Sequence, residues 1–464
     1  MKTIKNRFFM LLGALVGAFA VTGCDEGLFD VKNPGRILDE DLNTAAGVAS
    51  LVTGMSSDFS ASYDNLAFTT AILSDEIVGS GSYFSTGRYR RGLFDSEDAN
   101  GFWAGVQRAR WVAEAGLLRM KEIEGYQFDG NIQTARAYLF AGLANRWFGE
   151  NFCKTVFSAP YTEEVPGPGG EIDTGVEMDR EAAFERAVPL LEAAIQHGGA
   201  AGATDIVNAA RGGLAQVYVG LGDATNALAN ASMVPTDFVF AAAYSSNSGR
   251  EESIIWNETH GRHEISAWMT LAGTYGAGDP RTPWTDCSDA SANCPSGNGA
   301  DGQTIHYRQE KYPTRDDDIP LVKGTEMRLI EAEAALNNGD LAGAMAKINE
   351  ARGHYGLDAL ESDGTIGSIT GGEGGGAHPT SMSGWDILDR ERHLTLWLEG
   401  RRLWDMQRWD HPHLNGGGVV YEATVDRRVT CDVLGGPRHI GMPIALDECQ
   451  VNENIDTQTR CFSK

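Results

Sequence analysis

Apolar residues recur at helical spacing along most of this chain. Two runs show it most clearly: Phe102, Val106, Ala109, Val112 and Leu117, then Phe184, Ala187, Leu191 and Ala194. Spacings of three to five residues place such side chains on one face of an α-helix, which can then be buried against a neighbouring helix. The pattern therefore predicts a mainly α-helical protein built from packed amphipathic helices.

Two segments repeat a helix-turn-helix pattern. The first lies between Ile206 and Val234, the second is RLIEAEAALNNGDLAGAMAKINEAR, and a Gly-Asp pair, beginning at Gly222 or Gly339, marks the turn of each. Small residues at matching offsets let two antiparallel helices approach closely, as in a tetratricopeptide repeat. A third, partial copy, RAYLFAGLANRWFGE, predicts a first helix with its turn at Gly149 and no clear second helix.

The two full repeats are far apart in the sequence, so we expect a large insertion in a helical-repeat scaffold. Residues 244–320 or so contain few helical signals and many turn residues, which favours long loops with short strands. A second stretch, about 361–384, is rich in glycine and is predicted to be a flexible loop. Loops on a rigid scaffold are where binding residues usually lie.

The N-terminus carries an export signal. Basic residues precede the stretch FFMLLGALVGAFAVTGC, which is shorter than the ~20 apolar residues of a membrane-spanning helix. Its end, Val21 to Cys24, resembles a bacterial lipobox, so we predict a lipoprotein signal peptide over 1–23 and a lipidated Cys24. Residues 24–464 would then form a single domain. The alternative is an ordinary signal peptide cleaved beside a free cysteine.

The other six cysteines form an even set, as expected for disulfides in an exported chain. Cys287 and Cys294 bracket the short polar loop CSDASANC and are the favoured pair. Three pairings stay open for the remaining four, which are Cys153, Cys431, Cys449 and Cys461. A zinc site is disfavoured because no CxxC spacing occurs and the histidines are scattered.

Charge narrows the range of partners. The formal net charge of −26 argues against nucleic acid and against anionic lipid surfaces, since both would be repelled. The glycine-rich stretch is not followed by the Gly-Lys-Ser/Thr of a phosphate loop, and we predict no cofactor and no metal.

Two segments, FDVKNPGRILDEDLN after Cys24 and NRWFGENF, resemble parts of a known family. The first looks like the opening segment of SusD/RagB-family outer-membrane lipoproteins, and the second is similar to that family's helix followed by an aromatic-Gly turn. The most specific match, DILDRERHLTLWLEGRRLWDMQRW from Asp386 to Trp409, resembles the family's late helix. GMPIALDECQVNENI resembles the closing segment, with its usual Asn-Pro pattern reduced, and the insertion at 244–320 is not covered.

This resemblance implies a SusD-like fold and a role in nutrient uptake. Family members are surface-exposed receptors, anchored by lipid to the outer membrane and facing the cell exterior. They deliver a nutrient, most often an oligosaccharide and sometimes a peptide, to a SusC-like TonB-dependent β-barrel transporter, over which they act as a lid. Asp25 and Glu26 resemble the acidic export tag of such surface lipoproteins.

The residue pattern of the late segment predicts a helix independently of the family resemblance. Ile387, Leu394, Trp397 and Trp404 share one face of a continuous helix over 386–409. We expect Glu399 to pair with Arg402 and Arg401 with Asp405, at the i,i+3 and i,i+4 spacings where side chains meet on a helix. These charges are interpreted as part of the scaffold.

Candidate ligand contacts lie in two loop-like segments. Sugars bind aromatic faces, with hydrogen bonds from amide, carboxylate or guanidinium groups to their hydroxyls. The candidates are Tyr83, Phe84, Arg88 and Tyr89 in GSGSYFSTGRYRRGLF, and Trp256, Trp268, Tyr275, Trp284 and Tyr307 in the insertion. Packing in the core or at an interface is the alternative for each aromatic residue.

An enzyme is disfavoured because no nucleophile elbow, HExxH or Cys-His pattern occurs. His260 and His263 form an isolated HxxH, and the acidic run at Asp316 lacks the spacing of a calcium loop. Two alternative functions remain open. One is a glycoside hydrolase-like envelope enzyme using paired carboxylates, and the other is a repeat-based periplasmic adapter that binds protein.

Overall fold

A computed structural model describes residues 39–90, 94–159, 174–273, 276–361, 383–409 and 441–455. Cys24 with the signal segment, Tyr275, Cys431, Cys461 and most of the glycine-rich stretch lie outside these residues. The described chain is mainly helical, as predicted, with short strands in two-stranded pairs. None of its helices is long and apolar enough to cross a bilayer.

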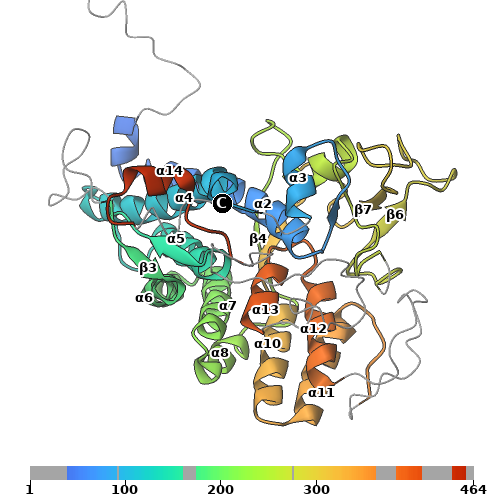
Figure 1. The fold of residues 1–464 in the computed structure, drawn as a ribbon. Coiled ribbons are helices and arrows are strands. Elements are labelled where there is room, and N and C mark those ends of the chain that lie inside the picture. Colours follow the sequence, from blue (N-terminus) through green and yellow to red (C-terminus); the bar gives the residue numbers. More distant parts are fainter. Residues whose placement is uncertain are drawn as a thin grey trace, which may run out of the picture.

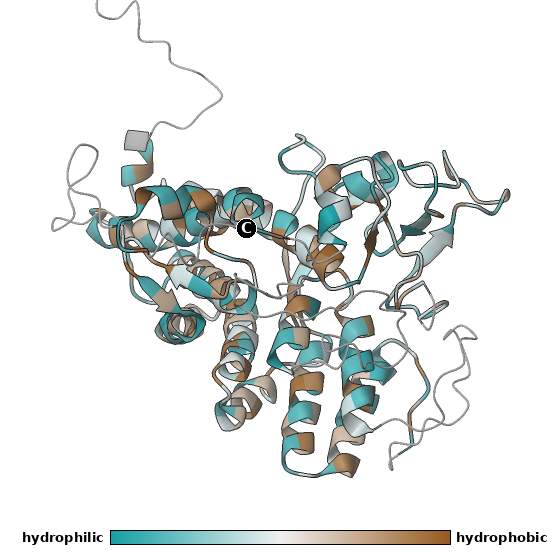
Figure 2. Ribbon diagram, viewed as in Figure 1, coloured by the Kyte–Doolittle hydropathy of each residue, from teal (hydrophilic) through white to brown (hydrophobic). Residues whose placement is uncertain are grey.

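Long helices form the upper left part of the molecule (Figure 1). The short η2 (Asp39–Asn43) leads to α2 (Val48–Leu73), which packs against α4 (Ser96–Glu122) and α5 (Ile132–Asn151), and α5 packs against α6 (Arg180–Ala200). The two predicted apolar runs lie on α4 and α6. Both apolar and hydrophilic residues occur along each helix, as expected for helices with one buried face (Figure 2).

Both predicted repeats are helical hairpins. The first is α7 (Thr204–Gly220) with α8 (Ala224–Ala231), and the second is α10 (Gly324–Asn337) with α11 (Leu341–His354). Gly222 and Gly339 have φ values of 69° and 74°, a left-handed conformation that glycine adopts without steric cost. The following aspartates cap α8 and α11 through their side chains. The hairpins meet where α8 packs against α10 (Figure 1).

The predicted turn at Gly149 is wrong. Helix α5 continues through Gly149 to Asn151, and its packing partner α6 supplies the second helix. A Cβ atom on Gly149 would lie 2.6 Å from Cζ of Phe184, so this glycine permits close approach of the two helices instead of a turn. Between the helices, β2 (Lys154–Val156) pairs with β3 (Glu177–Asp179) in antiparallel fashion.

The continuous late helix predicted over 386–409 is also wrong. The segment forms α12 (Gly384–Thr395) and α13 (Arg402–Arg408), separated by a turn in which Leu398 and Gly400 have φ values of 58° and 64°. A right-handed helix cannot contain such residues. Ile387, Leu394, Trp397 and Trp404 are all buried, as expected, but they do not share one helix face.

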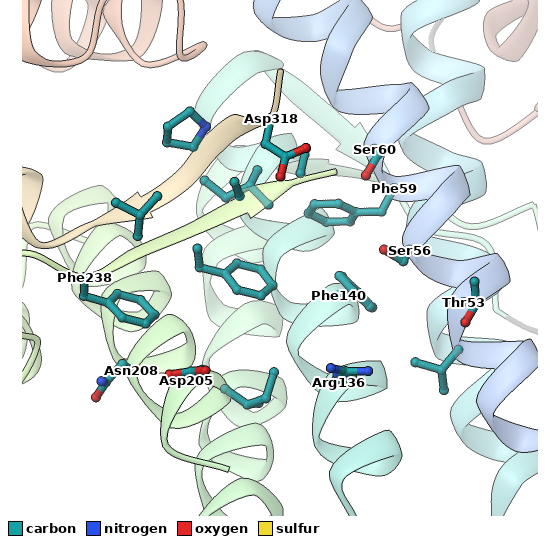
Figure 3. Close-up of a pocket in the computed structure, with 18 of the residues that line it drawn as sticks. Thr53, Ser56, Phe59, Ser60, Arg136, Phe140, Asp205, Asn208, Phe238 and Asp318 are labelled. Carbon is teal, nitrogen blue, oxygen red and sulfur yellow. The ribbon is translucent and has the colours of Figure 1, made fainter. Parts of the chain in front are cut away.

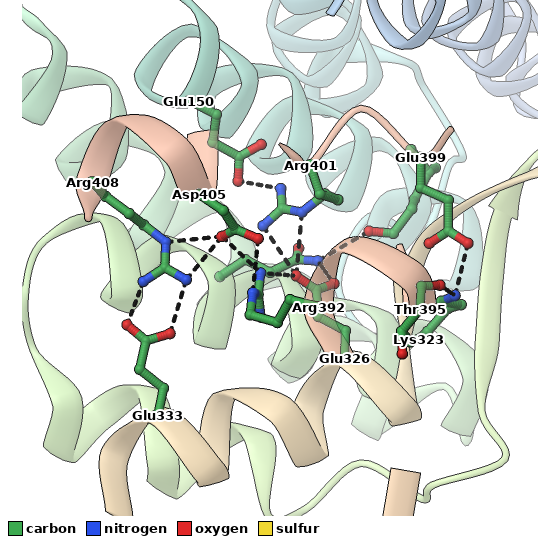
Figure 4. Close-up of polar contacts among 12 residues, drawn as sticks. Glu150, Lys323, Glu326, Glu333, Arg392, Thr395, Glu399, Arg401, Asp405 and Arg408 are labelled. Atoms are coloured by element: carbon green, nitrogen blue, oxygen red, sulfur yellow. Dashed lines mark hydrogen bonds and ion pairs between the residues drawn. The ribbon is translucent and has the colours of Figure 1, made fainter. Parts of the chain in front are cut away.

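The expected charge pairs are replaced by longer-range partners (Figure 4). Arg401 binds Glu150 and Glu326, and Arg402 binds Asp389. Arg392 donates to both oxygens of Asp405 at 2.8 and 3.0 Å. Burial raises the pKa of Asp405, but Arg392 and Arg408 outweigh it and lower that pKa to about 2. This buried network joins α5, α10, α12 and α13, which supports the scaffold interpretation.

The chain between the two hairpins forms only short elements among its described residues. It starts and ends at β4 (Val239–Ala242) and β8 (Ile319–Lys323), which pair in antiparallel fashion. Between them lie α9 (Ile254–Trp256), the π-helical turn η3 (Asn257–Gly261), β5 (Ile265–Ser266), β6 (Trp284–Asp286) and β7 (Tyr307–Gln309). After α13, α14 (Leu446–Val451) packs on α4.

Candidate ligand-binding face

The two segments with candidate ligand contacts meet in the fold. Strand β1 (Val78–Gly79) pairs with β5 in antiparallel register, Val78 opposite Ser266 and Gly79 opposite Ile265. The backbone N–H of Ser80 continues the contact by donating to the carbonyl of Glu264 at 2.8 Å. Short strands therefore bring the residues after β1 beside the insertion. We call the surface of these two segments, with Tyr83, Phe84, Trp268, Trp284 and Tyr307, the aromatic face.

Tyr83 and Phe84 are the most exposed aromatic residues of this face. They begin α3 (Phe84–Tyr89), a short helix where the sequence predicted a loop, and they are 41% and 79% exposed. Glu264 accepts hydrogen bonds from Ser82 Oγ at 3.0 Å and from the N–H of Tyr83 at 3.4 Å. Arg262 donates to the hydroxyl of Tyr83. The start of α3 is therefore held on the insertion by polar contacts.

Arg88 and Tyr89 point to a different role. Arg88 forms ion pairs with Asp95 at 2.7 Å and with Asp98 at 3.0 Å, and Tyr89 is buried against Phe94. Asp95 and Asp98 form the capping box of α4, so these contacts fix α3 to the start of α4. Arg88 and Tyr89 therefore hold α3 in position and are not placed as ligand contacts.

Trp284 and Tyr307 form a stacked pair on strands β6 and β7. Their ring centroids are 4.1 Å apart and their planes differ by 9°. The register places Tyr307 opposite Asp286, two residues along from Trp284, so the rings lie on one face of the strand pair. Trp284 Nε1 donates to the carbonyl of Ala272 at 2.8 Å, which fixes its ring. Both residues are half-buried.

The predicted disulfide between Cys287 and Cys294 is confirmed, and it closes the loop that follows β6. Cys153 and Cys449 are also disulfide-bonded. Among the described residues, no group of three or more histidine, cysteine and carboxylate side chains is placed to hold a metal ion.

Trp256 and Trp268 lie at the edges of the insertion. The Trp256 ring is covered by the guanidinium of Arg315, 4.7 Å from its centroid, and stacks on His260. Trp268 is half-buried and is followed by Met269, which is 49% exposed with φ of 58°. Trp268 is therefore more available than Trp256 for contact with a ligand.

Charged groups beside the stacked pair have shifted pKa values. Burial raises the pKa of Glu310, but hydrogen bonds from His260, Thr285 and Arg308 outweigh it and lower the pKa to about 2. Burial and the neighbouring His263 lower the pKa of His306 to about 4. At neutral pH Glu310 is therefore ionised and the buried His306 is neutral.

A groove of about 990 Å³ lies elsewhere in the molecule, between α2, α5, α7 and β4 (Figure 3). None of the described ligand candidates lines it. The sequence analysis missed this groove, because its walls come from α2, α5, α7, β4 and β8, which are far apart in the sequence. The spacing of Phe238 and Phe240, which places two aromatic rings on one side of a strand, was the available local signal.

Comparisons with known proteins agree with this fold. Residues 304–433 match the sequence profile of the SusD family. A SusD homolog from Bacteroides thetaiotaomicron VPI-5482 is similar with a TM-score of 0.60 and 15% identity, covering 89% of this chain and 97% of that one. A search of curated protein sequences finds no match.

Two further solved structures share the fold. A SusD-like carbohydrate binding protein from Bacteroides vulgatus ATCC 8482 has a TM-score of 0.55 and 14% identity, with 79% of this chain and 83% of that chain covered. A laminarin binding SusD-like protein has a TM-score of 0.54 and 14% identity, with 87% and 97% covered. The profile match over residues 304–433 and the shared fold together support a SusD/RagB family protein.

Proposed function

We propose that this protein binds an oligosaccharide on the aromatic face and does not cleave it. The observation that carries the proposal is the pairing of β1 with β5, which brings the segment of the exposed Tyr83 and Phe84 beside the insertion that holds the stacked pair Trp284 and Tyr307. Solved relatives with this fold include a laminarin binding protein and a carbohydrate binding protein, which supports a glycan ligand.

The chemistry of the face suits a neutral sugar chain. Exposed aromatic rings offer flat apolar surfaces to the C–H faces of sugar rings. Arg262 and Glu264, which lie beside Tyr83, offer a donor and acceptors for hydroxyl groups. Their mixed charge favours no net charge on the ligand, so we expect affinity to depend weakly on salt.

The SusD profile match and the predicted N-terminal signal support a proposal for the role in the cell. We propose that residues 1–23 are removed, that Cys24 carries the lipid anchor, and that residues 24–464 form one domain on the outer face of the outer membrane. There the protein would pass its nutrient to a SusC-like TonB-dependent transporter and act as its lid. Purification after mild detergent extraction tests the transporter partnership, and we expect a large β-barrel protein to co-purify. Purification of this protein without such a partner would contradict the lid role.

Calorimetry with the soluble chain from residue 25 onward tests glycan binding. Laminarin oligosaccharides, starch oligosaccharides and short peptides serve as probes. We expect Phe84→Ala and Trp268→Ala each to weaken glycan binding about fivefold, since one aromatic contact contributes ~1 kcal/mol. Trp385→Ala, at a 40% exposed tryptophan on α12, is the matched control and should bind as the wild type does.

Two results would contradict the proposal. Equal affinity of all variants for every glycan would remove the aromatic face from the site. Release of shorter sugars during incubation would instead favour the hydrolase alternative, and product analysis by chromatography detects it.

A further inference from the structure

The groove beside β4 has features of a binding site that the aromatic face does not share. Strand β4 forms one wall, and residues of α2, α5 and the start of α7 form the other walls (Figure 3). All four residues of β4 line the groove, which has a volume of about 990 Å³. This is space enough for a segment of several residues and not only for a small molecule.

Strand β4 is an edge strand. Its single partner among the described strands is β8, and on β8 the carbonyl of Leu321 accepts from Gln216 Nε2 at 3.1 Å. The N–H of Gly324 donates to the carbonyl of Phe238 at 2.8 Å, and Val239 lies opposite Lys323. In an antiparallel pair this register turns the N–H and C=O of Val239 away from β8.

Within the part of the chain that the structure describes, these two groups of Val239 have no hydrogen-bond partner. The side chain of Val239 is 53% exposed, so nothing described covers this position. An uncovered strand edge is a template for a further strand, because each added residue satisfies polar backbone groups on both chains.

The side chains of the groove suit an extended chain with apolar residues. Phe238, which directly precedes β4, and Phe240 of β4 are half-buried and line the groove together with the buried Phe140 (Figure 3). Residues two apart in an added strand repeat at ~6.6 Å, the same period as the two phenylalanines. Alternate side chains of the added strand would therefore meet successive rings.

The charges at the rim select a basic partner. The lining includes three carboxylates, Asp205, Asp237 and Asp318, against one guanidinium, that of Arg136. Asp205 and Asp237 are exposed, whereas Asp318 accepts a hydrogen bond from the N–H of Tyr244 at 3.0 Å. In a chain with a formal charge of −26, this rim attracts cations and repels acidic segments.

We propose that this groove binds an extended peptide segment of another protein, which adds to β4 as a third strand and carries lysine or arginine residues toward Asp205 and Asp237. The aromatic rings contribute apolar contact, and Val239 contributes the pair of backbone hydrogen bonds that sets the register. A sugar would use the rings and carboxylates, but it would leave the Val239 backbone groups without an extended partner. The inference is independent of glycan binding on the aromatic face.

Fluorescence anisotropy tests the proposal with a labelled, capped heptapeptide of alternating valine and lysine, and with the same peptide carrying glutamate for lysine. We expect the lysine peptide to bind, and the glutamate peptide to bind at least tenfold more weakly. Val239→Pro removes the N–H of the edge and should weaken binding tenfold or more. Val239→Thr keeps the backbone and the branched shape, and should stay within about twofold of the wild type.

Two measurements keep the test decisive if the proline variant folds poorly. The double variant Asp205→Asn with Asp237→Asn changes exposed residues only. It should bind the lysine peptide more weakly, and its affinity for that peptide should depend less on salt concentration. Hydrogen exchange read by mass spectrometry should show slower exchange over residues 235–244 when the peptide is bound.

Several outcomes would overturn the inference. These are no binding of the lysine peptide at millimolar concentration, equal binding by the Val239→Pro and Val239→Thr variants, or protection outside the groove. Displacement of the peptide by laminarin oligosaccharides would assign the groove to sugar. Slower exchange over 235–244 that depends on protein concentration alone would assign it to a second copy of this chain.

Discussion

Glu399 offers the sharpest test of how the core is held together. It lies in the turn between α12 and α13, where a single oxygen, Oε1, accepts from Lys311 Nζ at 2.6 Å and from Lys323 Nζ at 2.7 Å. The side chains of Glu399, Lys311 and Lys323 are 2%, 15% and 8% exposed. Glu399→Gln keeps the shape and an acceptor oxygen but leaves two buried ammonium groups without a carboxylate.

The expected cost is large. Removing one partner of a buried ion pair costs about 3–5 kcal/mol, because the remaining charge has lost its water and gained no counter-ion. A domain is stable by about 5–15 kcal/mol, so this variant should lose about a fifth or more of its stability. Both lysines keep their hydrogen bonds to the carbonyls of Trp397 and Thr395, which places the loss near the lower end of that range.

The stability of the Glu399→Gln variant should change with pH in a definite direction. Burial lowers the pKa of Lys311 to about 8 even though Glu399 opposes the shift, and for Lys323 burial lowers the pKa but Glu399 raises it above the usual value. Without Glu399, both values fall. Unfolded lysines titrate near 10.4, so between about pH 8 and 10 the unfolded variant binds more protons than the folded one, and its stability rises with pH.

Urea unfolding followed by tryptophan fluorescence measures the effect. At pH 7 we expect a midpoint lowered by 1 M or more, since urea slopes are about 1–3 kcal/mol/M, and a smaller deficit at pH 10. The control Asp179→Asn breaks an exposed pair with Lys154 and should cost about 1 kcal/mol or less. Equal losses in the two variants, or a Glu399→Gln deficit that grows with pH, would refute the reasoning.

Two further substitutions test the helix contact and the buried acid. Gly149→Ala should destabilise by about 1–3 kcal/mol, because its Cβ would lie 2.6 Å from Phe184. Gly101→Ala, in α4 with nothing within 4 Å of the added Cβ, should stabilise by about 0.5–1 kcal/mol. Thermal unfolding compares the two, and the same sign in both would contradict the packing argument. Burial raises the pKa of Asp64 from 3.8 to about 8, although the N–H of Ile254 donates to it. A raised pKa contributes stability that is complete below pH 3.8 and lost as pH rises through 8, so Asp64→Asn should gain on the wild type across that window by up to ~5 kcal/mol. Parallel stability curves from pH 4 to 8 would rule this out.

Much of the scaffold follows from local signals in the sequence. Apolar spacing predicts α4 and α6, and the Gly-Asp turns at Gly222 and Gly339 predict both helical hairpins. The short loop between Cys287 and Cys294 likewise predicts their disulfide. In each case the deciding atoms lie within a few residues of one another, so periodicity, helix capping and loop closure act with little help from the rest of the chain.

The errors share a different cause. The segment 386–409 has a helical pattern, yet the structure breaks it at Leu398 and Gly400 so that Glu399 reaches Lys311 and Lys323. Arg401 likewise finds Glu150 and Glu326 instead of its sequence neighbour. Burying many charges requires every one to meet a partner, and distant elements supply those partners.

The two proposed sites divide in the same way. The sequence by itself determined which aromatic residues are candidates, since residue type and nearby glycines are local properties. The tertiary structure alone decided that the segment after β1 lies beside the insertion, that Tyr89 is buried, and that β4 keeps an open edge beside a groove. Exposure and unpaired backbone groups depend on what the rest of the chain covers, and no local pattern records that.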